Sequence, residues 1–241
     1  MVEPSTAPAD TAPSVDPVPD RHVLFFDFDG TLADSGHGIS ESMREVFEGV
    51  GAPPLSDDEV RLIVGPPFKQ TMPVLLASRG IDPSRSDEFI HEYRRVYKEH
   101  HLPRTPMIAG MREVVEALAP HWHLAVVTAK PMTQAVVGVR ATGLDGHMVT
   151  VVGPPDDEPL PKSRLLAQAI DEVNDRLRTS IDVAQCWMIG DRNHDVHAAI
   201  EVGTRSAGVL WGFGDRTELV DAGTHVVLAD PAELLSLLLP G

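Results

Sequence analysis

A chain of 241 residues with 42% hydrophobic content is long enough to bury a substantial core, as one domain with a large insertion or as two small domains. Its formal net charge of −16 argues against nucleic acid or an anionic membrane as a main partner, because the field of the protein would repel both. The single cysteine, Cys186, excludes an internal disulfide and fits a reducing compartment, so we expect a cytoplasmic protein.

The first twenty residues differ in composition from the rest of the chain. They contain five prolines, no aromatic residue and no lysine or arginine. Such a segment cannot bury a core, and it lacks the basic start and apolar stretch of a secretory signal. We therefore expect a disordered, proline-rich tail over residues 1–20, and no later apolar run approaches the length of a membrane span.

An apolar run, Val23 to Phe26, leads directly into Asp27 and Asp29, and Gly30 follows. The run is typical of a strand buried on both faces in a parallel sheet. Two aspartates at this spacing can offer a side chain and a neighbouring carbonyl to a hard cation such as Mg2+. An ordinary strand that ends in an Asp/Gly turn has the same local pattern, so the rest of the chain must decide between the two interpretations.

Helical spacing dominates residues 37–104, and no strand pattern occurs there. Ser56 to Glu59 form a capping box at the start of one of these helices, and Pro73 is expected to bend the next one. The predicted helices cover residues 39–50, 56–64, 68–79 and 83–100. We interpret this segment as a helical domain inserted into the main fold.

From residue 105 onward, helical and strand patterns alternate. After the first strand, the predicted strands are residues 124–128, 148–152, 186–189, 206–210 and 225–228. The predicted helices are residues 111–119, 132–142, 163–178, 195–202, 216–222 and 231–239. This alternation predicts an α/β fold with a doubly wound, mostly parallel, Rossmann-like sheet, formed by residues 21–36 and 105–241.

Polar side chains follow three of the predicted strands: Asp27 and Asp29 after the first, Thr128 after the second, and Asp191 and Asp195 after the fourth. The carboxyl ends of parallel strands meet at one edge of the sheet, so we expect these residues to share a pocket. A helix that starts near Asp191 would place Asp191 and Asp195 on one face, towards the same metal ion. Taken singly, Thr128 is typical of a threonine whose hydroxyl forms a hydrogen bond within its own turn. Asp195 taken singly is typical of an aspartate that caps the start of a helix.

A cation is needed before an anionic phosphate can approach so many carboxylates. The chain has four lysines, and Lys162 stands at the start of the helix that precedes the Asp191 strand. We therefore favour Lys162 for this role, and Lys130, two residues after Thr128, is the rival.

Taken in order, four segments resemble the motifs of the haloacid dehalogenase superfamily: Asp27 to Leu32, Val127-Thr128, Lys162, and Gly190 to Asp195. The resemblance spans roughly residues 22–239, and the helical insertion resembles the helical cap of that family. Gly65 to Pro67 and Trp211 to Gly214 resemble its phosphoglycolate phosphatase and 5'-nucleotidase-like branch more weakly.

The resemblance implies a role for each motif residue. Asp27 would be the nucleophile and Asp29 the general acid and base, and Thr128 and Lys162 complete the implied catalytic set. The implied Mg2+ ligands are Asp27, Asp29 through its carbonyl, Asp191 and, in support, Asp195. The residues expected to contact the substrate are Gly30, Thr128, Ala129, Lys162 and the cap residue Lys69.

These expectations favour a Mg2+-dependent phosphatase that hydrolyses a small phosphate monoester through an aspartyl-phosphate. One alternative is a phosphotransferase, either a phosphomutase or a protein phosphotransferase, and a second is a non-catalytic scaffold. Arg44 and Gly65 to Pro67 are further candidates for substrate contact in the cap, while His194 could line the pocket mouth or face solvent. The default expectation for the assembly is a monomer or a weak homodimer.

Overall fold

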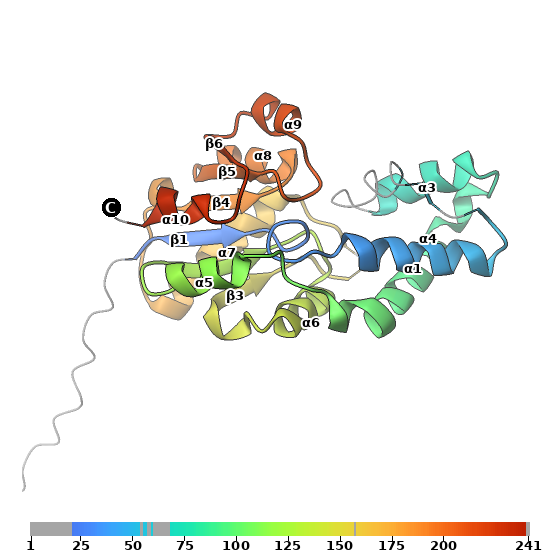
Figure 1. Ribbon diagram of the computed structural model, residues 1–241, viewed down its shortest axis with the longest axis horizontal. Coiled ribbons are helices and arrows are strands. Elements are labelled where there is room, and N and C mark those ends of the chain that lie inside the picture. Colours follow the sequence, from blue (N-terminus) through green and yellow to red (C-terminus); the bar gives the residue numbers. More distant parts are fainter. Residues whose placement is uncertain (1–20, 54, 57–58, 60–67, 157, 240–241) are drawn as a thin grey trace, which may run out of the picture.

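The computed structural model describes residues 21–53, 55–56, 59, 68–156 and 158–239. Its centre is a six-stranded parallel sheet in the order β3-β2-β1-β4-β5-β6 (Figure 1). The strands are β1 (Val23–Phe26), β2 (His123–Val127), β3 (Met148–Val152), β4 (Trp187–Gly190), β5 (Arg205–Val209) and β6 (Val226–Leu228). This is the order of a doubly wound α/β sheet, as predicted.

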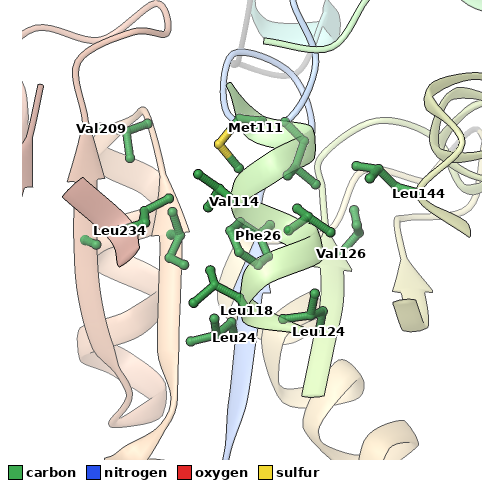
Figure 2. Packing of buried hydrophobic residues seen from close by; sticks show 14 of the residues in the cluster. Leu24, Phe26, Met111, Val114, Leu118, Leu124, Val126, Leu144, Val209 and Leu234 are labelled. Carbon is green, nitrogen blue, oxygen red and sulfur yellow. The ribbon is translucent and has the colours of Figure 1, made fainter. Parts of the chain in front are cut away.

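The central strand is apolar on both faces because both faces of the sheet are covered. Leu24 and Phe26 lie in one apolar cluster with residues of α5 (Met111–Leu118) and α10 (Glu233–Leu238), and Figure 2 shows Phe26, Val114 and Leu234 among its side chains. Val23 and Phe25 lie in a second cluster on the opposite face, with residues of α7 and α8. The helices of this part are α5 (Met111–Leu118), α6 (Met132–Thr142), α7 (Lys162–Leu177), α8 (Asn193–Val202), α9 (Arg216–Asp221) and α10 (Glu233–Leu238).

The helices of the predicted cap lie beyond the carboxyl end of β1 (Figure 1). They have an apolar cluster of their own, whose buried members run from Ile39 to Leu102. The helices are α1 (Gly36–Gly49), α3 (Phe68–Ser78) and α4 (Ser86–Val96), followed by a π-helical turn at Tyr97–His101. The boundaries of cap and core, residues 37–104 against 21–36 and 105–241, remain a prediction.

Most element predictions are confirmed to within two residues, and the differences have local causes. The fourth cap helix is broken, because a 3-10 turn at Pro83–Arg85 precedes α4 and the π-helical turn follows it. The capping box is present: the backbone N–H of Ser56 donates to Glu59 at 2.8 Å, and that of Glu59 donates to the Ser56 hydroxyl at 3.4 Å. The rest of that helix, Gly65 to Pro67 and the tail lie outside the described residues.

Among the described residues, no helix combines the length and apolar character that crossing a membrane requires.

Candidate active site

Three neighbouring strands bring the predicted site residues to one edge of the sheet. β1 pairs with β2 on one side and with β4 on the other. The pairing extends past β1, because the backbone N–H of Asp27 donates to the carbonyl of Ile189 at 2.8 Å. Chain connectivity reverses between β1 and β4, and open α/β folds place their ligands at this switch point. Asp27, Thr128 and Asp191 are therefore held at the carboxyl edge by the sheet itself.

Asp27 lies against a buried lysine. The Nζ atom of Lys162 is 2.7 Å from Asp27 Oδ1 and 2.8 Å from Asp195 Oδ1, and the lysine side chain is only 3% exposed. Asp27 Oδ1 also accepts a hydrogen bond from the backbone N–H of Phe28 at 2.7 Å. Lys162 therefore connects two carboxylates that are more than a hundred residues apart in sequence.

Burial and neighbouring charges both shift the pKa values of these groups. Burial raises the pKa of Asp27 to about 7, although Lys162 partly offsets the effect. Burial raises the pKa of Asp191 well above its ordinary value, and Asp27 adds to that shift. Burial alone would lower the pKa of Lys162, but Asp195 and Asp27 outweigh it and raise the pKa, so the lysine keeps its charge.

Asp29 is paired with the other candidate lysine. Lys130 Nζ lies 3.1 Å from Asp29 Oδ2, and the lysine side chain is 4% exposed. The chain turns sharply after Asp29, where Gly30 has a φ of +77° and a Cβ would lie 2.7 Å from the Phe213 ring. Glycine is required here because the turn needs a left-handed backbone and the loop at Phe213 packs against it.

Thr128 and Ala129 line the same pocket as Asp27 and Asp29. The Thr128 hydroxyl accepts a hydrogen bond from the backbone N–H of Lys130 at 3.1 Å. The hydroxyl thus forms a hydrogen bond within its own turn, which was one of the two interpretations of Thr128. Its hydrogen can still be donated to a ligand.

Asp191 is held by a loop that follows β5. The backbone N–H of Phe213 donates to Asp191 Oδ2 at 2.7 Å, and a Cβ on Gly212 or Gly214 would overlap atoms of Asp191. Trp211 Nε1 donates to the carbonyl of Thr31 at 3.1 Å, which ties the loop to the segment after Asp29. The segment Trp211 to Gly214 thus positions site residues, a role that no pattern in its sequence indicates.

Asp195 has two roles at once. Its backbone N–H donates to the Arg192 carbonyl and its Oδ2 accepts from the Arg192 N–H, each at 3.1 Å, so it caps α8 while Oδ1 pairs with Lys162. The prediction that Asp191 and Asp195 share a helix face is wrong, because α8 begins only at Asn193. Asp191 lies in the preceding turn, and this turn brings it towards Asp27.

The pocket in front of Asp27 is lined by residues of cap and core. Lys69 lines this pocket, and so do two cap residues that the sequence did not single out, Tyr93 and Arg94; contact of Lys69 with the substrate stays a prediction. His194 also lines the pocket rather than facing solvent, and burial lowers its pKa. Arg44 does not reach the pocket: it is exposed on α1 and pairs with Glu41 and Glu48. Gly30, Lys162 and Asp195 are not among the residues that line this pocket, so substrate contact for Gly30 and Lys162 stays a prediction.

The donor set fits a hard divalent cation. Asp191 Oδ1 is buried and has no hydrogen-bond partner among the described residues. Ligand atoms of Asp27, His194 and Asp195 lie within 4.8 Å of one another. When ionised, the four carboxylates outnumber the two lysines, and oxygen-rich negative sites of this kind suit Mg2+.

The fold and the arrangement of acids define a class: a doubly wound α/β protein with a cluster of carboxylates at the switch point of its sheet. The family model of haloacid dehalogenase-like hydrolases matches residues 24–209, and the chain belongs to that family.

Named relatives cover most of the chain. Pyrophosphatase PpaX of Anoxybacillus flavithermus is 28% identical over 90% of this chain and 96% of its own length. A 5'-nucleotidase of Pseudomonas aeruginosa is 30% identical over 81% of this chain and 86% of its own. Tyrosine-protein kinase PtkA of Mycobacterium tuberculosis is 30% identical over 88% of this chain and 69% of its own.

A crystal structure described as a predicted phosphatase from Clostridium acetobutylicum superposes with a TM-score of 0.78 at 26% identity, covering 91% of this chain and 98% of its own. The predictions of the family and of the α/β fold are confirmed.

Proposed function

We propose that the protein is a Mg2+-dependent phosphatase that hydrolyses a small phosphate monoester through an aspartyl-phosphate on Asp27. The observation that carries the proposal is the environment of Asp27: a buried lysine behind it and a pocket lined by Lys69 and Arg94 in front of it. The pyrophosphatase and 5'-nucleotidase relatives support phosphate esters or anhydrides as the substrate class.

The first half of the reaction transfers the phosphoryl group to the protein. Asp27 Oδ1 is occupied by Lys162 and the N–H of Phe28, which leaves Oδ2 to attack phosphorus. As the bond between phosphorus and the leaving oxygen breaks, protonated Asp29 gives its proton to that oxygen, and the alcohol departs. The Thr128 hydroxyl donates to a phosphoryl oxygen.

The second half returns the protein to its starting state. Asp29, now ionised, takes a proton from a water molecule that attacks phosphorus. The bond to Asp27 breaks, inorganic phosphate leaves and Asp29 is protonated again. Lys162 stabilises the carboxylate of Asp27 each time it is released.

Asp27, Asp191 and the backbone carbonyl of Asp29 would hold the Mg2+ ion, with Asp195 in support. Bound there, the ion supplies positive charge between the nucleophile and the phosphate.

The test is release of inorganic phosphate from a panel of phosphate esters in the presence of Mg2+. The wild-type protein is expected to release phosphate from at least one ester, and Asp27→Asn is expected to lose about 10³-fold or more of that activity. Equal release by the wild type and by Asp27→Asn would instead support the non-catalytic scaffold.

A second candidate is transfer of the phosphoryl group to an acceptor other than water, which the similarity to the tyrosine-protein kinase PtkA favours. The same aspartyl-phosphate serves both reactions, so the acceptor distinguishes them. Phosphorylated acceptor without release of free phosphate would support the phosphotransferase and overturn the phosphatase.

A further inference from the structure

Lys130 lies where three parts of the molecule meet. It follows β2, its ammonium group is 3.1 Å from Asp29 Oδ2 after β1, and it donates to the hydroxyl of the cap residue Tyr97 at 3.3 Å. The ammonium nitrogen is also 4.5 Å from the centroid of the Tyr97 ring. Because the lysine side chain is only 4% exposed, these contacts replace most of its hydration.

The contact fixes one oxygen of Asp29 and leaves the other available. Oδ2 faces Lys130, whereas Oδ1 is buried without a hydrogen-bond partner among the described residues, and Asp29 lines the pocket. A carboxylate held in this way by a charged partner cannot rotate freely about its terminal bond. The oxygen that faces away from Lys130 is the one suited to exchange a proton with a ligand.

The other lysine of the site has a separate task. Lys162 pairs with Asp27 and Asp195, and neither carboxylate is a partner of Lys130. The two lysines therefore divide the carboxylates between them, the nucleophile on one and the acid on the other.

We propose that Lys130 is a positioning residue for the general acid Asp29, and that Tyr97 makes this positioning depend on the cap lying against the core. The proposal rests on the proposed phosphatase function. Lys130 transfers no proton itself, and its effect is to hold Asp29 Oδ1 where the leaving oxygen needs a proton.

Leaving groups of different basicity test this role. An aryl series of 2,4-dinitrophenyl, p-nitrophenyl and phenyl phosphate needs progressively more help from a general acid. For Lys130→Met, we expect kcat/KM to fall about 10- to 100-fold with phenyl phosphate and less than about 3-fold with 2,4-dinitrophenyl phosphate. Asp29→Asn is the reference and should show the same pattern more strongly.

Two conservative variants complete the series. Lys130→Arg retains a cation that can reach Asp29 and should recover part of the activity on phenyl phosphate. Tyr97→Phe removes the hydroxyl contact but keeps the ring. We expect the same dependence on the leaving group with a smaller effect, a fall in kcat/KM of about 2- to 5-fold with phenyl phosphate. The comparison is a ratio of substrates within one preparation, so a fraction of misfolded protein cancels.

An equal loss on all three esters, together with weaker inhibition by inorganic phosphate, would identify Lys130 as a phosphate-binding residue and overturn the proposal. An unchanged leaving-group dependence in both Lys130→Met and Tyr97→Phe would also overturn it. Failure of the proposed phosphatase function can be distinguished from failure of the role of Lys130. In the former case the wild type would release no phosphate from any member of the series.

Discussion

At the scale of single residues, the two buried lysines of the site have carboxylate partners. The side chains of Lys162 and Lys130 are almost fully buried, and each contacts at least one carboxylate of the site. An unpaired charge in such surroundings costs several kcal/mol, so removing one partner destabilises the charge that remains. The same rule applies outside the site, to the pair of Glu59 and Arg79 in the cap.

Glu59→Gln tests this rule through pH. Two hydrogen bonds of 2.7 Å join Glu59 to Arg79, whose side chain is 7% exposed, and Arg79 lowers the pKa of Glu59 to about 2. The folded-state pKa lies below the ordinary value, so the pair stabilises the fold above about pH 4.5 and this contribution is lost as the pH falls towards 2. We expect the substitution to lower the free energy of unfolding by roughly 1 kcal/mol at pH 7, and the difference from wild type to shrink below pH 4.5.

Urea unfolding at pH 7 and at pH 3 measures the two differences. Glu88→Gln is the matched control, because Glu88 pairs with Arg85 on the exposed surface and its loss should leave stability unchanged at both values. A difference between Glu59→Gln and wild type that stays constant from pH 7 to pH 3 would contradict the assignment.

At the scale of elements, the loops after the strands build the site, and the strands align them. The loop from Trp211 to Gly214 contributes no carboxylate, yet it donates the backbone hydrogen bond from Phe213 that orients Asp191. Its glycines are required by space, since a side chain at Gly214 would overlap the carbonyl oxygen of Asp191. Backbone atoms cannot rotate away from such a contact as a flexible side chain can.

Gly214→Ala is therefore expected to displace this loop from Asp191 and to lower kcat/KM at least about 10-fold, while the sheet remains folded. The measurement is phosphate release with saturating Mg2+, beside circular dichroism to confirm the fold. Gly146→Ala is the control, because a Cβ there meets nothing within 4 Å and full activity should remain. Full activity in Gly214→Ala would refute the role given to the loop.

At the scale of the whole molecule, folding brings together carboxylates that repel one another. The pKa values of Asp27 and Asp191 are raised mainly by burial, so we expect a cation bound near both carboxylates to stabilise the folded state. A ligand that binds only the folded protein stabilises it by about 2.7 kcal/mol at a hundred times its Kd.

Saturating Mg2+ is accordingly expected to raise Tm by roughly 5–10 °C in a chain of this length. NaCl at matched ionic strength should reproduce little of that shift. Asp191→Asn removes one of the proposed ligands and should reduce the shift by more than half in a thermal melt. An equal shift in wild type and Asp191→Asn would place the metal elsewhere.

At the scale of the whole molecule, the cap also contributes residues to the pocket in front of the core acids. Lys69 on α3 and Arg94 on α4 line it together with acids of the core, so we expect a bound substrate to contact both parts of the molecule. For Lys69→Met we expect KM to rise about 10-fold with little change in kcat, because a cation distant from the reacting atoms binds ground state and transition state alike. Steady-state kinetics on the best ester of the panel measure both constants, and Arg44→Met, at an exposed position on α1, should change neither.

The α/β architecture and the strand ends that carry the acids could be predicted from local sequence patterns. Buried runs such as Val23 to Phe26 and the alternation of strand and helix are local patterns. Such patterns can be recognised without knowing which segments pack together in the fold. Asp27, Thr128 and Asp191 could be placed at the carboxyl edge of the sheet because parallel strands share a direction. This holds for any conformation of the loops between them.

The pairing of the charged groups could not be predicted in this way, because it depends on how distant segments pack. No local pattern indicates that Lys162 contacts Asp27 and Asp195, that Lys130 contacts Asp29 and the cap residue Tyr97, or that the loop at Phe213 holds Asp191. Each contact joins segments distant in sequence, and a shift of a few ångströms in one loop would change the partner. The strength of a charge interaction depends steeply on such distances and on burial, and both are properties of the assembled chain.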